Sequence, residues 1–178
     1  SETAEIGLQA ALTGHLVFST VHANNAAGVI PRLLDLNIKP STIGPALNLI
    51  IAQRLVRRLC DNCKKPAELP SELKVKIENL INLLPVRVDK LKYKDWQTFG
   101  PIGCDKCNKS GYRGRIGIFE LLKVDVAFEE FINKEIGEGE LFKKALEQGM
   151  VTIQQDGALK IVSGFTTIKE VEVVVGSL

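Results

Sequence analysis

The sequence has no apolar run near the roughly 18 residues that a membrane-spanning helix requires. It has no Gly-Lys pair, so the phosphate-binding pattern G-x-x-x-x-G-K-[ST] is absent, and so is the dinucleotide pattern G-x-G-x-x-G. It has only 2 histidines, too few to form a metal site by themselves. No secretory signal opens the chain, which begins inside a helical pattern, and we expect it to be a fragment.

The charges of the chain are nearly balanced. The 23 Lys and Arg residues against 21 Asp and Glu residues give a net charge of +2, too small to indicate a nucleic acid or an anionic membrane as partner. With 178 residues and 45% hydrophobic content, the chain can bury one sizeable core, or form one medium and one small domain.

The cysteines come as two Cys-x-x-Cys pairs, Cys60 with Cys63 and Cys104 with Cys107. Two such turns supply the four thiolates of a tetrahedral zinc site, which is structural because protein atoms fill every position. Gly103 and Gly111 flank the second pair and suit tight turns. Two disulfides are the main alternative, disfavoured by the lack of a signal peptide. A redox motif would require a thioredoxin-like context that is absent.

The stretch around the two histidines predicts a polar site. Leu16–Val21 is apolar and rich in β-branched and aromatic residues, which predicts a buried strand. His15 would then stand at the strand's entry and His22 at its exit, where ligands bind in a parallel α/β sheet. A capped strand with an incidental histidine remains the alternative.

Helical patterns surround this strand. Thr3–Leu12 predicts a helix that ends at Gly14. Asn24 predicts the N-cap of a helix through Leu36, which Pro31 should kink or shorten. Asn37 is a suitable C-terminal stop.

Ser41 suits the cap of a further long helix. Its apolar stripe would repeat every four residues, at Leu47, Ile51, Leu55 and Leu59. Three arginines lie off this stripe, Arg54, Arg57 and Arg58. They indicate either a solvated helix face or contacts to a carboxylate or phosphate.

The segment 64–103 is an insert between the cysteine pairs. Ser71–Leu84 predicts a helix and Val86–Phe99 a lysine-rich edge strand, with Trp96 as a packing residue. Beyond the second pair, Ile116–Leu122 predicts a strand.

Two arginines, Arg113 and Arg115, precede that last strand on either side of Gly114. They fit contact with a phosphate or carboxylate, or else a surface hairpin.

The rest of the chain is helical in pattern. The expected helices are Glu129–Ile136, Glu140–Gln148, Ile153–Ser163 and a last one opened by a capping box at Thr167–Glu170. No polar residues converge there, so this tail predicts a small packing or regulatory bundle.

Several segments together resemble the secretion ATPases, and more narrowly the C-terminal part of the motors of type IV pilus assembly and type II secretion. These segments are Ser1–Ile6, Gln9–Val17, Ser19–Asn24, Ala52–Cys60 and Gly111–Glu120. The tetracysteine pattern favours these motors over the pilus retraction motors of the same superfamily.

The resemblance implies a fold and a division of the chain. The fold would be α/β, a partial RecA-like P-loop NTPase core with an inserted tetracysteine zinc module and a small C-terminal helical bundle. The corresponding domains are residues 1–59, 60–123 with the 64–103 insert, and 124–178. Pro31 and Asn37 depart from the residues that the family usually has there.

The resemblance also implies an activity. The parent would hydrolyse ATP with Mg²⁺ as a homohexamer, cytoplasmic and peripheral to the inner membrane, and would act on a membrane platform protein. Glu2 and Thr3 match the end of the Walker B segment, and His15 and His22 match the histidine box. His22 is the stronger candidate for sensing the γ-phosphate.

Within the resemblance, Arg113 and Arg115 match positions near the nucleotide. The phosphate-binding loop would precede Ser1, so this fragment should not hydrolyse ATP alone. No nucleic-acid partner is expected. The alternative is a non-enzymatic zinc module that docks a protein or nucleic acid through Arg54, Arg57, Arg58 and the lysine-rich segment 86–94.

Overall fold

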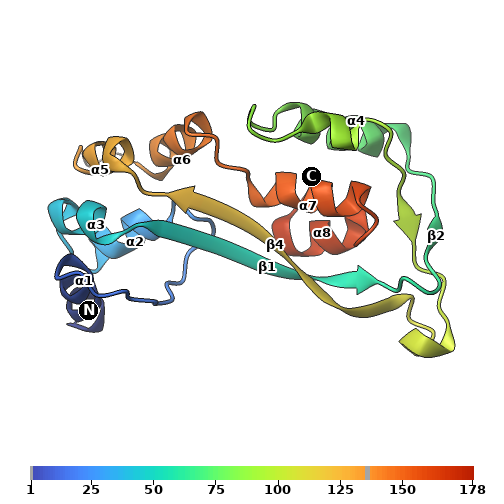
Figure 1. Ribbon diagram of the computed structural model, residues 1–178, viewed down its shortest axis with the longest axis horizontal. Coiled ribbons are helices and arrows are strands. Elements are labelled where there is room, and N and C mark those ends of the chain that lie inside the picture. Colours follow the sequence, from blue (N-terminus) through green and yellow to red (C-terminus); the bar gives the residue numbers. More distant parts are fainter. Residues whose placement is uncertain (1, 135–136) are drawn as a thin grey trace. The chain divides into compact units, whose positions relative to one another are not determined.

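Two long strands, β1 (Leu49–Leu59) and β4 (Tyr112–Lys123), pair in a two-stranded sheet (Figure 1). Their backbone hydrogen bonds join Val124 N to Asn48 O at one end and Cys60 N to Gly111 O at the other, so the strands are antiparallel. The structure is a computed structural model and describes residues 2–134 and 137–178. No helix in these residues combines the length and apolar character needed to cross a membrane.

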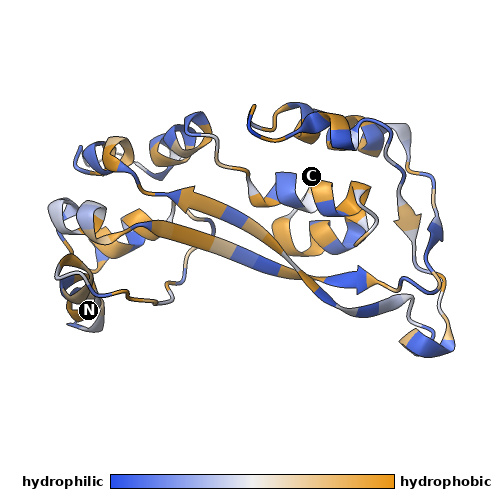
Figure 2. Ribbon diagram, in the orientation of Figure 1, coloured by the Kyte–Doolittle hydropathy of each residue, from blue (hydrophilic) through white to orange (hydrophobic). Residues whose placement is uncertain are grey.

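The residues cluster into two units. The first comprises Ser1–Ala52 and Glu120–Met150, and the second comprises Gln53–Phe119 and Val151–Leu178. The unit boundaries therefore fall inside β1 and β4. Figure 2 shows that β1 is hydrophobic over its first part and hydrophilic toward its C-terminal end.

The first unit is built from short helices and the first part of β1. The helices are α1 (Glu2–Leu12), α2 (Val29–Asp35), α3 (Pro40–Ala46), α5 (Val126–Ile132) and α6 (Glu138–Glu147). Ile30, Ile43 and Phe128 are among the fully buried side chains of its core. Helix α3 packs closely on α5, because a Cβ built at Gly44 would lie 2.5 Å from Cγ of Glu129.

The helix ends expected near the N-terminus are confirmed. Gly14 follows α1 with φ +91°, and Asn37 follows α2 with φ 61°, both in the left-handed region that ends helices. Pro31 lies in the first turn of a helix of only 7 residues, where no backbone N–H is required of it. The helix starts later than expected, at Val29 instead of directly after Asn24.

The buried strand expected at Leu16–Val21 is wrong. This segment has no regular secondary structure, and Leu16 and Phe18 are 81% and 88% exposed. A strand needs neighbours to bond its backbone, and the described part of the chain places none beside this segment.

The long helix expected from Ser41 is also wrong. A helix ends at Ala46 with Leu47 as its C-cap, and the other residues of the expected stripe, Ile51, Leu55 and Leu59, belong to β1. A spacing of four is even, so such residues share a face in a strand as well as in a helix. Ile51 and Leu55 lie on the exposed face of β1, whereas Ile50 and Val56 are buried.

The second unit holds the insert, the cysteines and the last helices. Its remaining elements are β2 (Lys65–Pro66), α4 (Ser71–Asn82), η1 (Lys90–Tyr93), β3 (Phe99–Gly100), η2 (Asp105–Cys107), α7 (Ile153–Val162) and α8 (Ile168–Val175). Strands β2 and β3 pair antiparallel, and α7 packs against α4 and α8. The helix expected from Ser71 is confirmed, and Trp96 packs against this core as expected.

The edge strand expected at Val86–Phe99 is wrong, because most of this segment forms turns and η1. The lysines at positions 90 and 92 lie on that short helix, which Asp89 caps through its carboxylate. Only Phe99 pairs in a sheet. The strand expected at Ile116–Leu122 is confirmed and begins earlier, at Tyr112.

The tail helices are present but belong to different units. Helices α5 and α6 are in the first unit, and α7 and α8 are in the second, and the single C-terminal bundle stays a prediction. The first expected helix, Glu129–Ile136, ends at a residue that lies outside the described part of the chain. The observed helix at this place, α5, starts earlier, at Val126, with Asp125 as its N-cap.

The capping box expected at Thr167 is wrong. Thr167 makes no capping bond, and its Oγ1 lies 3.1 Å from the hydroxyl of Tyr112. Glu170 instead accepts two hydrogen bonds from the Arg57 guanidinium, from Nε at 2.9 Å and from Nη2 at 2.6 Å. A capping box does occur at Thr152, where Gln155 is the partner.

We expect Gly157→Ala to destabilise the second unit. A Cβ at Gly157 would lie 2.6 Å from Cγ1 of the buried Val171, so α7 and α8 would have to move apart. The free energy of unfolding, from urea titration followed by circular dichroism, should fall by about 1–3 kcal/mol. Gly139→Ala is the control, because no atom lies within 4 Å of that Cβ, and it should change stability by less than about 1 kcal/mol. Equal behaviour of both variants would contradict the packing argument.

The Arg57–Glu170 pair should make stability depend on pH. Hydrogen bonds from Arg57 lower the pKa of Glu170 below its ordinary value of 4.5, despite partial burial. Its stabilising contribution is therefore complete above that value and is lost as the pH falls through the lowered pKa of the folded state.

Glu170→Gln should lower the free energy of unfolding by about 1 kcal/mol at about pH 7, and the difference should vanish in acid. Glu172→Gln on the same helix is the control, since no ion pair of Glu172 occurs among the described residues. Stability curves against pH that stay parallel for Glu170→Gln and the unmodified chain would contradict the assignment.

Candidate functional site

The four cysteines converge in the second unit, as the two Cys-x-x-Cys pairs predict. Their sulfur atoms all lie within 4.8 Å of one another. The Sγ atoms of Cys60 and Cys104 are 3.9 Å apart, and those of Cys63 and Cys107 are 3.8 Å apart. A disulfide would require about 2.05 Å, so the cysteines are free thiols. Four thiols in this arrangement can hold a metal ion.

Tight backbone turns bring each pair of thiols together. The carbonyl of Cys60 accepts from Cys63 N at 3.1 Å, and the carbonyl of Cys104 accepts from Cys107 N at 3.1 Å. Gly103 has φ +105°, and a Cβ there would lie 2.5 Å from the carbonyl oxygen of Lys109. This close approach explains the glycine before the second pair.

Burial and hydrogen bonds shift the pKa values of two of the thiols, Cys63 and Cys107, in opposite directions. Burial raises the pKa of the Cys63 thiol to about 11. Burial also acts to raise the pKa of Cys107, but N–H donation from Cys104 and Gly111, at 3.2 and 3.3 Å, outweighs it and lowers that pKa to about 6. Cys107 is therefore better prepared than Cys63 to bind a cation as thiolate.

The histidine segment lies in the first unit and is exposed. Nδ1 of His15 lies 3.2 Å from Oγ1 of Thr13 and 3.3 Å from the carbonyl oxygen of Ala10, so this imidazole rests on the end of α1. His22 lies in the exposed irregular segment, and Glu2 is in the first turn of α1. No hydrogen bond joins these three candidates among the described residues.

The loop after His22 is held by two acidic residues that the sequence analysis missed. Glu120, 1% exposed on β4, accepts a hydrogen bond from Ala26 N at 2.8 Å. Asn25 donates to Glu138 at 3.0 Å and accepts from Gly28 N at 2.7 Å. One signal was available, because Glu120 is the only charged residue within Ile116–Leu122. A carboxylate in a buried strand position needs a donor.

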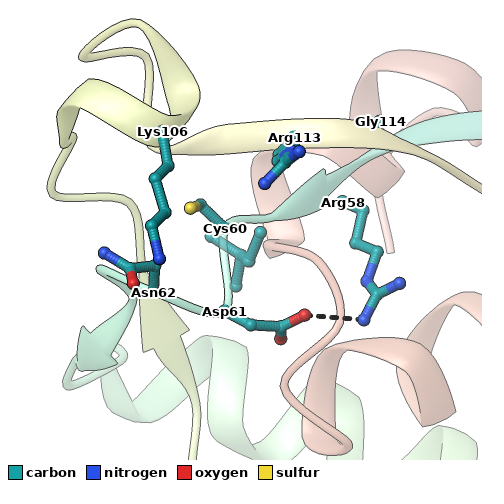
Figure 3. Close-up of a pocket in the computed structure, with 8 residues that line it drawn as sticks. Arg58, Cys60, Asp61, Asn62, Lys106, Arg113 and Gly114 are labelled. Carbon is teal, nitrogen blue, oxygen red and sulfur yellow. Dashed lines mark hydrogen bonds and ion pairs between the residues drawn. The ribbon is translucent and has the colours of Figure 1, made fainter.

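Arg113 and Arg115 lie in the second unit, and both are exposed on β4. They are not equivalent. Arg113 lines a hollow beside Cys60, together with Arg58 and Lys106 (Figure 3). Arg115 is not among the lining residues.

The arginines of β1 are engaged within the chain. The guanidinium of Arg57 binds Glu170 and lies over the ring of Tyr112, with Cζ 4.2 Å from the ring centroid. Arg58 Nη2 donates to Asp61 at 2.7 Å. Both side chains are also partly exposed to solvent, and the carboxylates that they contact belong to this chain.

Comparison with known proteins finds a family and several relatives that match nearly the whole chain. The family described as "Type II/IV secretion system protein" matches residues 1–173. The chain is 42% identical over 170 residues to the type IV pilus assembly ATPase PilB of Myxococcus xanthus, and also 42% identical over 170 residues to the type II secretion system ATPase E of Vibrio cholerae. PilB of Pseudomonas aeruginosa is 39% identical.

Each of these alignments covers 96% of the chain but only 28–31% of the relative. The chain thus spans about three tenths of the length of these proteins. The family match covers nearly all of the chain, and the chain belongs to the type II/IV secretion system protein family.

Proposed function

We propose that the chain is the C-terminal part of a motor ATPase that powers type IV pilus assembly or type II secretion. The similarity to PilB and to the type II secretion ATPase along 96% of the chain carries this proposal. The proposed parent is a homohexamer, cytoplasmic and peripheral to the inner membrane, that acts on a membrane platform protein. The absence of a G-x-x-x-x-G-K-[ST] pattern leaves ATP binding mainly to other parts of the parent.

In this proposal the chain is part of a RecA-like core, and other parts of the parent cover the exposed segment Leu16–Val21. Its exposed apolar side chains and its lack of backbone partners in the described residues support this. Such a segment gains hydrogen bonds and buries Leu16 and Phe18 only when other segments cover it.

His22 is then the proposed sensor of the γ-phosphate of the nucleotide. Directly after that segment, its exposed imidazole can donate a hydrogen bond to a phosphate oxygen as charge develops on it. Glu2 belongs to the proposed acidic segment that serves Mg²⁺, and His15 supports the same site. Arg113 and Arg115 are proposed nucleotide contacts.

The four thiols fit structural zinc. Tetrahedral bonds of about 2.3 Å to zinc place sulfurs about 3.8 Å apart. Three Sγ pairs are 3.8 to 3.9 Å apart, and all four atoms lie within 4.8 Å of one another. Cys60, Cys63, Cys104 and Cys107 would hold the ion, which contributes rigidity and takes no part in catalysis.

The alternative, a docking module that uses its β1 arginines, has less support. Arg57 is already bound to Glu170 through two hydrogen bonds, which leaves it poorly placed for an external partner.

Zinc binding predicts a defined stoichiometry. The purified chain should contain about one zinc per molecule by elemental analysis, with thiols that react with a disulfide reagent only after chelation. Cys107→Ser should lose most of the metal and lower the melting temperature, whereas Ser163→Ala should change neither. Thiols that react freely in the metal-containing protein would overturn the assignment.

A longer form of the protein, extended to cover its relatives, tests the ATPase proposal. We expect ATP hydrolysis by the long form and none by the present chain. His22→Ala in the long form should lower kcat by roughly 100-fold. The melting temperature should stay nearly unchanged, because the imidazole is exposed. Lys76→Ala on α4 is the control and should leave the rate unchanged. Comparable losses of rate and stability in His22→Ala would contradict a sensor role.

A further inference from the structure

The hollow beside the cysteine cluster has the features of an anion site. It lies wholly within the second unit and has a volume of about 650 Å³. Figure 3 shows Lys106, Arg113 and Arg58 around it, with Asp61 joined to Arg58. These side chains come from η2, β4, β1 and the first cysteine turn, so four separate segments contribute to one space.

The residues that line the hollow carry a net positive charge. Its lining has three cations and one carboxylate, which leaves two positive charges without a counterpart in the lining. The carboxylate of Asp61 is itself bound twice, by Arg58 at 2.7 Å and by Lys64 at 3.0 Å. It therefore has little capacity left to neutralise Lys106 or Arg113.

One donor of Arg58 lacks an acceptor. Nε of Arg58 is buried and has no hydrogen-bond partner among the described residues, although Nη2 is bound to Asp61. The guanidinium also lies over the ring of Phe165, with Cζ 5.8 Å from the centroid, which helps to fix its position. Buried donors in proteins nearly always have an acceptor, which for a single N–H is often an ordered water.

The number of cations around the hollow favours a phosphate over a carboxylate as its ligand. In the same unit one arginine, Arg57, is enough to bind the carboxylate of Glu170 through two hydrogen bonds. Three cations around one space suit an anion with three terminal oxygens and two charges. The hollow is larger than a phosphate alone, which favours a phosphate carried by a larger molecule.

We propose that this hollow binds the phosphate group of a phosphate monoester, with Lys106, Arg113 and Arg58 as its donors. The assignment separates Arg113 from Arg115, which does not line the hollow. It requires no ATP hydrolysis, so phosphate binding by this chain and the ATPase activity of a longer form can fail independently.

Calorimetric titration of the metal-loaded chain with inorganic phosphate and with AMP tests the proposal. Both should bind. Lys106→Ala and Arg113→Ala should each weaken binding by roughly tenfold. Lys109→Ala is the matched control, because Lys109 follows the same cysteine turn but does not line the hollow, and it should bind as the unmodified chain does. Tighter binding of AMP identifies a nucleotide as the source, and equal binding identifies the phosphate group alone.

Two results would overturn the proposal. One is a lack of binding of both compounds to the unmodified chain. The other is unchanged phosphate binding in Lys106→Ala and Arg113→Ala together with faster loss of metal to a chelator, which would show that these cations only balance the charge of the thiolates. Melting temperature and thiol protection, measured on each variant, confirm that it is folded.

Discussion

The convergence of the four thiols sets the local geometry on which the second unit depends. The two cysteine pairs are separated by an insert of 40 residues, 64–103, yet their sulfurs lie within 4.8 Å of one another. Bringing them together places Cys60 N 2.9 Å from Gly111 O, which fixes how the end of β1 meets the start of β4. The contact of Arg57 with Tyr112 and the hollow beside Cys60 both follow from that register.

Charge is arranged around this cluster in two different ways. Arg57 is matched to Glu170, and each satisfies the other. One residue further along β1, Arg58 shares Asp61 with Lys64, and the Lys64 ammonium, together with Arg58, lowers the pKa of Asp61. The first arrangement holds α8 against β1. The second leaves cations in excess beside the thiols, whose own negative charge on binding a metal would draw the same side chains closer.

Sequence patterns predicted those parts of the fold that local chemistry decides. Gly14, Asn37 and the paired cysteines are signals of this kind, and each is confirmed. Prediction of secondary structure failed where contacts with residues distant in sequence decide it. Leu16–Val21 has the composition of a strand but no partner in the described residues, and the spacing of Ile51 and Leu55 does not distinguish a helix from a strand.

The candidate site shows the same difference between features decided by local sequence and features decided by distant residues. The convergence of the four cysteines could be predicted from two short motifs. The role proposed for His22 rests on the resemblance, since nothing near it in sequence determines its setting. Its loop is held by Glu120 and Glu138, which lie 94 residues from Ala26 and 113 residues from Asn25. A buried carboxylate that accepts a backbone N–H constrains the loop as firmly as a helix cap would, yet it has no local signature. The shape of the histidine loop is therefore determined by β4 and α6 rather than by the residues next to His22.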